Sequence, residues 1–273
     1  MSLTRAEQEA FARDGYLVRP DAVDAATVDA LNTRLSQLIT RCAAEHLEGT
    51  RTSRAFWDIL RCSADDASVC WDTPGGEMPA RAEDWESRAM RVGHGLHRVD
   101  DLFATVARAP ALGGVLAALV PPPAWILQST VVYKQPRSSA VQFGLHQDAA
   151  YLTTEPESLV LAFLALDEMD EDNGALAVVP GTHHDPLHVA LAMGPEGFSP
   201  VAGRSRPERD YTKVLLPLRR GTAVFVHGRT LHASGPNRSD KPRRALIVHA
   251  MSGTSRLASN TWIQPPPGGF MAV

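Results

Sequence analysis

The chain has 273 residues, of which 44% are hydrophobic and 21% are charged, so it is long enough to bury one substantial core. The formal net charge is -4, and Arg204, Arg206 and Arg209 are interleaved with proline and glutamate, which argues against a nucleic-acid partner. Three cysteines without a CxxC pair argue against a disulfide framework, and no segment approaches the roughly 18 apolar residues of a membrane span, so we expect a soluble, cytoplasmic protein.

Helical signals dominate the first 120 residues. Thr4 and Glu7 form a capping box, and Gly15 ends the short helix that they begin, before a strand-like segment at 16–18. Apolar residues then recur at helical spacing and predict an amphipathic helix with one buried face: Val28, Leu31, Leu35, Leu38, Ile39 and Cys42. The segment 72–83 is rich in proline and glycine and predicts a surface loop. Two shorter helices are expected near 101–108 and 110–119, before the three prolines at 121–123.

From Trp125 onward, short β-forming segments replace the helices: 125–133, 158–166, 175–179, 213–218, 222–226 and 244–251. Regularly spaced short strands predict a barrel or sandwich. We expect one domain, residues 1–273, mainly β with flanking helices, in which 1–120 is mainly helical support and 125–265 is the barrel core. Asn173-Gly174 predicts a tight hairpin between two of these strands. The polar segment 184–211 is a candidate lid over a pocket.

One pair of side chains has the spacing of metal ligands. His146 and Asp148 lie two positions apart, and a β-strand points such residues to the same side. His232 follows the segment that ends at Val226, and a closed barrel can bring such distant segments side by side. Two histidines and one carboxylate leave three coordination positions free, which suits iron(II) that binds a keto acid and dioxygen. An isolated His-x-Asp pair is more often a surface hydrogen-bonded pair, so a second signal is needed.

The second signal is an arginine placed eleven residues after His232. A dicarboxylate cosubstrate needs a partner for its distal carboxylate, and the planar guanidinium group binds a carboxylate through two parallel hydrogen bonds. We assign this role to Arg243. Because strand side chains alternate, Arg243 and Arg244 point to opposite faces, and Arg244 is expected to be a solvated surface charge. His183, His184 and His188 also crowd together, but Pro186 disfavours a helical metal pair, and we interpret them as loop histidines.

Several motifs in combination resemble the phytanoyl-CoA dioxygenase family: His146-Gln-Asp148 with Tyr151, Asp172-Asn-Gly174, Pro180-Gly-Thr-His183 and His232-x-Ser-x-x-Asn-x-Ser-x-x-x-Arg243. Further positions resemble the phytanoyl-CoA dioxygenase domain-containing proteins within it: Gly93-His-Gly-Leu-His97, Gln128-Ser129, Lys134-Gln-Pro136 and Trp262-Ile-Gln264. The resemblance covers about 15–265. It implies a double-stranded β-helix (jelly-roll, cupin-like) barrel.

The resemblance also implies the ligands. Iron(II) would be held by His146, Asp148 and His232, and the cosubstrate 2-oxoglutarate by Arg243, helped by Ser234, Thr130 and Arg91. Such relatives tend to carry lysine in place of Arg91 and tryptophan in place of Leu164, and Thr130 replaces a larger residue. One class of relatives with halogenase activity lacks the carboxylate ligand, so the presence of Asp148 disfavours halogenation.

The expected activity is hydroxylation of a small molecule with decarboxylation of 2-oxoglutarate to succinate and CO2, using O2 as the second cosubstrate. Two alternatives remain: a non-catalytic barrel that binds metal or 2-oxoglutarate as a sensor or scaffold, and a cupin-type metal enzyme, which would carry His-x-His at 146–148. Small apolar or amphipathic substrates are favoured because no basic cluster near the predicted pocket suits a nucleotide phosphate. Tryptophans 57, 71, 85 and 262 are possible pocket walls, although ordinary packing is the simpler interpretation. The oligomeric state is not predicted.

Overall fold

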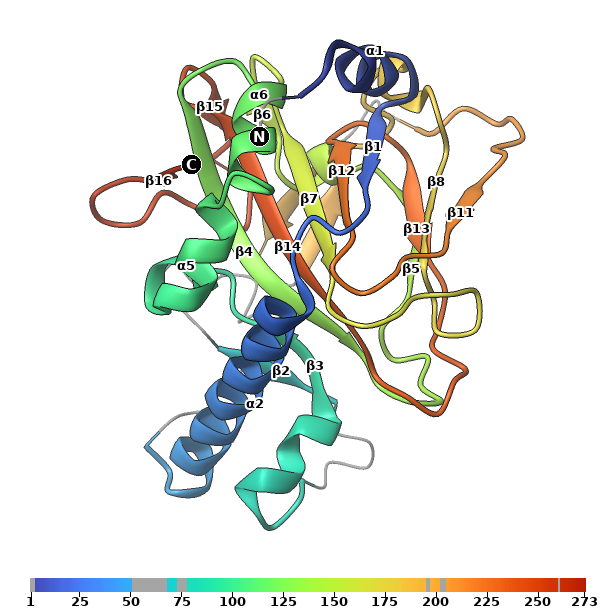
Figure 1. Cartoon of the computed structure of the whole chain (residues 1–273). Coiled ribbons are helices and arrows are strands. Elements are labelled where there is room, and N and C mark those ends of the chain that lie inside the picture. Colours follow the sequence, from blue (N-terminus) through green and yellow to red (C-terminus); the bar gives the residue numbers. More distant parts are fainter. Residues whose placement is uncertain (1–2, 51–67, 73–77, 195–196, 202–204, 260) are drawn as a thin grey trace.

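A computed structural model of the chain describes residues 3–50, 68–72, 78–194, 197–201, 205–259 and 261–273 (Figure 1). Two antiparallel sheets face each other, and helices cover the outer face of the larger sheet. Within these residues the larger sheet has eight strands, in the order β1 (Tyr16–Arg19), β12 (Ala223–His227), β7 (Val160–Ala165), β14 (Arg243–Ser252), β4 (Ala124–Lys134), β3 (Ala89–Val92) and β2 (Val69–Trp71), with β16 (Met271–Ala272) also paired to β4.

The smaller sheet contains His146 and His232, the two histidines predicted as metal ligands. Its four strands follow the order β11 (Val214–Leu216), β8 (Leu176–Val178), β13 (His232–Ser234) and β5 (Phe143–His146). Two short strand pairs lie outside both sheets: β9 (Leu191–Gly194) with β10 (Gly197–Pro200), and β6 (Thr154–Glu155) with β15 (Arg256–Leu257). The β9–β10 pair belongs to the segment predicted as a lid.

All four predicted helices are present, although the last one begins at Gly113 rather than near 110. Helix α1 (Arg5–Asp14) has the complete Thr4–Glu7 capping box and ends at Gly15, whose φ of 77° is the left-handed conformation that glycine adopts easily. Helix α2 (Ala25–Leu47) buries the predicted apolar face. Shorter helices follow: α4 (Leu96–Val99), α5 (Asp101–Arg108), α6 (Gly113–Leu119) and the 3-10 helices η2 (Ala82–Arg88), η3 (Asp148–Ala150) and η4 (Thr182–His184). None of the described helices is by itself long and apolar enough to cross a membrane, although α5 and α6 together, as a bent pair, reach that length and composition.

The central strands of the larger sheet are buried on both faces, which explains their continuous apolar sequence. On β7, Leu161 and Phe163 pack into the space between the two sheets, together with Leu176 and Val178 of the smaller sheet. Leu164, on the opposite face of β7, packs with residues of α2, α5 and α6. The helices therefore support the larger sheet from outside and leave its inner face for the site.

One organisational prediction needs correction. The segment around Asn173-Gly174 does not form a hairpin between neighbouring strands, because β7 pairs with β12 and β14 whereas β8 pairs with β11 and β13. Gly174 does have the positive φ expected of a turn glycine, 75°, but this turn connects the two sheets. The N-terminal region, predicted as mainly helical support with a strand-like segment at 16–18, also contributes the short strands β1, β2 and β3 to the larger sheet. Of the predicted loop at 72–83, residues 73–77 lie outside the described residues.

Candidate metal and cosubstrate site

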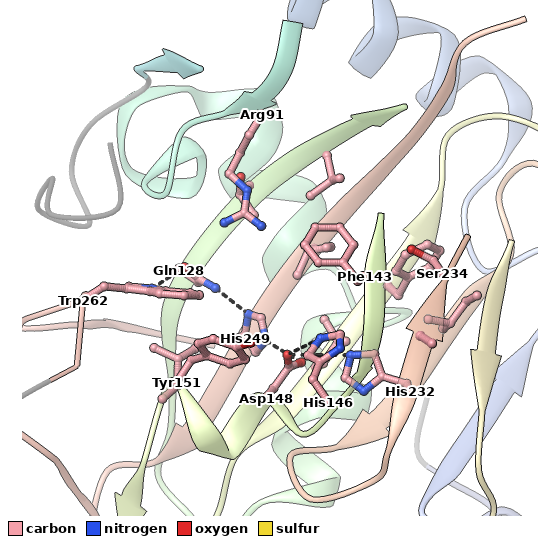
Figure 2. A pocket seen from close by; sticks show the side chains of 18 of the residues that line it. Arg91, Gln128, Phe143, His146, Asp148, Tyr151, His232, Ser234, His249 and Trp262 are labelled. Atoms are coloured by element: carbon pink, nitrogen blue, oxygen red, sulfur yellow. Dashed lines mark hydrogen bonds and ion pairs between the residues drawn. The ribbon is translucent and has the colours of Figure 1, made fainter. Parts of the chain in front are cut away.

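A cavity of about 460 Å³ lies between the inner faces of the two sheets. His146, Asp148 and His232 line it, and so do Arg243, Ser234, Thr130 and Arg91. All seven residues that the sequence predicts for metal or cosubstrate therefore face one cavity. Figure 2 shows the three predicted metal ligands converging, with Arg91 pointing toward the same space.

Strand pairing brings the two predicted histidine ligands together. His146 ends β5, His232 begins β13, and the two are direct partners in the antiparallel register, with ring centroids 4.2 Å apart. The two-residue spacing suggested that Asp148 lies on the same strand as His146. Asp148 instead begins the 3-10 helix η3, just after that strand. Buried Gln147 fixes this turn, because its side chain donates to the carbonyl of Arg229 and accepts from the backbone N–H of His188. The three side chains are the one group among the described residues that could hold a metal ion, with ligand atoms within 4.8 Å of one another.

The hydrogen bonds of the two histidines suit metal binding. Nδ1 of His146 lies 2.8 Å from the carbonyl oxygen of Gly144, and Nδ1 of His232 lies 3.0 Å from that of Thr230. A carbonyl oxygen can only accept, so each Nδ1 carries the proton and each Nε2 presents a lone pair. The two Nε2 atoms lie 3.5 and 3.7 Å from Oδ1 of Asp148. The donor set is therefore two neutral imidazoles and one carboxylate facing a common point, which fits a divalent transition metal.

The charges at this centre favour an ionised carboxylate beside a neutral His232 ring. Burial would lower the pKa of His146, but its contact with Asp148 raises that pKa, so a metal ion would displace a proton from this ring. Burial alone would raise the pKa of Asp148, but the adjacent His232 and His249 and the contacts of the carboxylate with His146 and His249 hold the pKa of Asp148 well below its usual value. Burial, reinforced by repulsion from His146, lowers the pKa of His232 to about 4. Metal ligation needs these protonation states, because a protonated imidazole has no lone pair to donate.

Arg243 and Arg244 point in opposite directions, as strand alternation predicts. Arg243 is 1% exposed, lines the cavity and donates a hydrogen bond to the carbonyl oxygen of Gly174, while its Nε has no hydrogen-bond partner among the described residues. Burial lowers the pKa of Arg243 to about 9, and no carboxylate in the part of the chain that the structure describes forms an ion pair with its guanidinium. Arg244 was predicted to be a solvated surface charge, and this prediction is wrong. Its guanidinium binds both carboxylate oxygens of Asp167 at 2.7 and 2.9 Å.

The remaining cosubstrate candidates are placed differently. Thr130 is buried and its hydroxyl donates to the carbonyl of Val92, at 2.9 Å, so that the oxygen remains available as an acceptor. Ser234 is buried two residues after His232. The side chain of Arg91 makes no hydrogen bond or ion pair with any part of the chain that the structure describes, and burial lowers the pKa of Arg91. Its guanidinium is thus a second cation, beside Arg243, facing the cavity.

The sequence did not identify His249 and Gln128 as members of the site. His249 Nε2 lies 3.0 Å from Oδ2 of Asp148, and Gln128 Nε2 lies 2.8 Å from His249 Nδ1 (Figure 2). The two are register partners on β14 and β4. The sequence offered one signal, a glutamine and a histidine within mostly apolar segments, but it could not reveal which carboxylate they approach.

Two other expectations concern residues around the cavity. Trp262 lines it, whereas Trp85 is a packing residue in edge-to-face contact with Trp71; Trp57 lies outside the described residues. Leu164, where relatives tend to carry tryptophan, was expected to change the pocket around the cosubstrate, but its side chain packs on the helix-covered face of the sheet. Phe163, on the opposite face, is the aromatic side chain beside Arg243, with its ring centroid 5.8 Å from the guanidinium carbon.

The crowded histidines do not form a metal site with one another in the described part of the chain. His183 and His184 are in η4 rather than in an irregular loop, with ring centroids 3.9 Å apart. Nε2 of His183 lies 3.0 Å from the carbonyl oxygen of Ala12, and this contact attaches η4 to α1. His188 is buried beside a separate cavity of about 130 Å³.

Known proteins share this fold. SnoN, an epimerase solved with Fe3+, alpha ketoglutarate and nogalamycin RO, has a TM-score of 0.67 at 20% identity, with 93% of this chain and 86% of that chain covered. EctD from S. alaskensis, solved with bound Fe, has a TM-score of 0.65 at 19% identity, and the match covers 97% of this chain and 82% of EctD. The predicted jelly-roll barrel is confirmed by these likenesses. Iron, and in one case the keto acid, are present in those two proteins, and the His146, Asp148 and His232 group could bind the same metal.

Sequence relatives extend over nearly the whole chain. Phytanoyl-CoA dioxygenase domain-containing protein 1 from Danio rerio is 29% identical over 96% of this chain and 95% of its own length. The protein named phytanoyl-CoA dioxygenase from Arabidopsis thaliana is 25% identical over 96% of this chain and 94% of its own length. The model of the family described as Phytanoyl-CoA dioxygenase (PhyH) matches residues 11–245. The resemblance seen in the motifs and the predicted class of enzyme are confirmed: the chain belongs to the phytanoyl-CoA dioxygenase family.

Proposed function

We propose that this protein is an Fe(II)- and 2-oxoglutarate-dependent dioxygenase that hydroxylates a small, largely apolar molecule. The observation that carries the proposal is the pair of Nε2 lone pairs of His146 and His232 facing Oδ1 of Asp148, at one end of a cavity that also contains the Arg243 guanidinium. This combination serves a metal and a dicarboxylate at the same time.

Each residue has a separate role in this proposal. His146, Asp148 and His232 hold the iron and leave three coordination positions free. Arg243 binds the distal carboxylate of 2-oxoglutarate, assisted by Ser234, while Thr130 and Arg91 contact the cosubstrate from β4 and β3. When bound, iron(II) and 2-oxoglutarate supply the activation of dioxygen, with succinate and CO2 as products. The protein orients the substrate and excludes water from the cavity.

The outer wall of the cavity supports an apolar substrate with a flat or cyclic part. The rings of Tyr151, Phe198 and Trp262 contact one another, with centroid distances of 5.1, 5.2 and 5.6 Å. We call these three residues the aromatic wall. Aromatic rings offer large contact areas and favour offset or edge-to-face partners, so a planar or cyclic ligand suits this surface. A neighbour in fold was solved with the small molecule nogalamycin RO, which agrees with a small-molecule substrate.

The segment 184–211 supplies part of this wall. The β9–β10 hairpin contributes Leu191, Phe198 and Pro200 to the cavity lining. We propose that this hairpin acts as a lid that closes over the bound substrate and keeps water out. Hydrogen exchange of backbone amides measured with and without ligand tests this role, and equal, strong protection of the hairpin in both states would contradict it.

The decisive experiment measures succinate and oxygen consumption together. Protein purified without oxygen is supplied with Fe(II), ascorbate and 2-oxoglutarate, first alone and then with members of a metabolite library. We expect slow succinate formation alone and faster formation with a flat or cyclic apolar compound that gains one oxygen atom. The control is His146→Ala, which should make no succinate. Binding of 2-oxoglutarate without any succinate across the library would instead support the sensor alternative.

A further inference from the structure

A buried hydrogen-bonded chain leads from Asp148 to the aromatic wall (Figure 2). Oδ2 of Asp148 lies 3.0 Å from Nε2 of His249, whose Nδ1 lies 2.8 Å from Nε2 of Gln128. Oε1 of Gln128 lies 3.3 Å from the indole nitrogen of Trp262 and 3.0 Å from Nδ1 of His94. Gln128 and His94 are 1% exposed and His249 is 5% exposed, so water cannot readily replace these contacts.

Trp262 determines the direction of every hydrogen bond in this chain. An indole N–H can only donate, so the group of Gln128 that faces it must be the carbonyl oxygen. The amide NH2 of Gln128 then faces His249 and donates to Nδ1. Because Nδ1 of His249 accepts, the ring proton is on Nε2, and Nε2–H donates to Oδ2 of Asp148.

We propose that His249 is a positioning residue for Asp148, held in its Nε2–H tautomer by Gln128 and Trp262. The hydrogen bond at Oδ2 fixes the rotation of the carboxylate and leaves Oδ1 turned toward His146 and His232. Partners of this kind, one shell outside the ligands, orient a carboxylate and commonly contribute tenfold or more to metal affinity. The role is separate from the binding of 2-oxoglutarate, and His249 does not itself act on the substrate.

The competing arrangement is a reversed Gln128 amide. Its NH2 group would then face the N–H of Trp262, donor against donor, and its oxygen would accept from a proton on Nδ1 of His249. His249 would then be either the Nδ1–H tautomer, whose Nε2 lone pair repels Asp148, or a cation. The two arrangements therefore predict different protonated nitrogens on the His249 ring.

Nitrogen-15 NMR of the metal-free protein at neutral pH distinguishes them. We expect the His249 signals of a neutral ring protonated at Nε2. Gln128→Glu replaces the donor by a group that only accepts, so His249 should gain a proton on Nδ1. A wild-type ring protonated at Nδ1, or a Gln128→Glu protein with an unchanged His249 pattern, would overturn the proposal. The measurement needs neither metal nor turnover, so a protein that has this tautomer but makes no succinate counts against the proposed function alone.

Manganese binding provides the second readout. Mn2+ affinity, measured from the free-ion EPR signal, should fall about 10- to 100-fold in His249→Phe. His249→Gln retains a donor and should recover most of this loss. The matched control is His227→Phe, which also replaces a histidine ring, half-buried and without a hydrogen bond or ion pair to Asp148 among the described residues, and it should bind Mn2+ like the wild type. Wild-type affinity in His249→Phe, or an equal loss in both phenylalanine variants, would contradict a positioning role.

Discussion

His146 and His232 are direct partners across the β5–β13 pair, although four strands of the two main sheets separate them in the chain. Their side chains converge only when the smaller sheet is fully assembled. A metal that binds both therefore binds the folded state and not the unfolded chain, and ligand binding of this kind stabilises a protein.

Metal should raise the stability of the wild type. At a free Mn2+ concentration 100 times the dissociation constant, the free energy of unfolding should increase by about 2.7 kcal/mol. Urea titrations with and without Mn2+ measure this difference. Asp148→Ala should lose the increase while His184→Ala, a histidine outside the metal group, should retain it. Equal stabilisation of both variants would place the metal elsewhere.

Arg243 and Arg244 provide a matched pair for the cosubstrate. Removing the buried cation that binds a carboxylate costs on the order of 3 kcal/mol, so Arg243→Met should raise the KM for 2-oxoglutarate roughly 100-fold. The KM of Arg243→Lys for 2-oxoglutarate should lie between those of the wild type and Arg243→Met, because a lysine retains the charge but not the two parallel hydrogen bonds. Arg244→Met loses the pair with Asp167 and should unfold more easily, with an unchanged KM. If the KM for 2-oxoglutarate rose in Arg244→Met and not in Arg243→Met, Arg244 rather than Arg243 would bind the cosubstrate.

Lys134 should make stability depend on pH. Its ammonium group is buried against the carbonyl oxygens of Val141 and Gly235, and burial, with repulsion from Arg243, lowers the pKa of Lys134 from 10.5 to about 7. Between pH 7 and 10.5 the unfolded chain therefore holds a proton that the folded protein lacks, so the free energy of unfolding rises with pH.

The measurement is urea denaturation at several pH values in that range. The wild type should gain up to about 1.4 kcal/mol per pH unit relative to Lys134→Met. Other groups that titrate in this range are common to both proteins and cancel in the difference. Parallel pH profiles of the two proteins would show that the buried amine keeps its proton.

The support given by α2 can be tested within one helix. Leu35 is fully buried on the face that packs against the larger sheet, while Leu47 at the end of the same helix is 48% exposed. Leu35→Ala should lower the free energy of unfolding by about 2 to 5 kcal/mol because it leaves a cavity. Leu47→Ala should change it by less than about 0.5 kcal/mol. Similar losses in the two variants would mean that α2 does not stabilise the barrel through this face.

Local spacing was sufficient for much of the site. The His-x-Asp pair, the third histidine and the arginine after it are encoded by distances along the chain, and strand alternation correctly separated Arg243 from Arg244. The amphipathic face of α2 and the capping box of α1 depend only on near neighbours, and both are confirmed.

What the sequence could not provide depends on which strands meet. A turn glycine at 174 has the same signal whether the next strand returns to its own sheet or crosses to the other one. Arg244 has a partner because Asp167 lies beside the end of β14, a contact between distant segments. His249 likewise becomes part of the site only through the register of β4 and β14 and the position of η3.

Gly174 shows how closely the two halves of the site depend on one turn. Its carbonyl oxygen accepts from Arg243, and a Cβ atom at this position would collide with the backbone oxygens of Gly235 and Pro236, in the turn that follows β13 and His232. Any other residue would shift both the guanidinium and the strand of the third histidine. Natural variation should therefore be narrow at this connection and broad at the rim of the barrel, where loops can diversify toward new substrates without disturbing the shared chemistry.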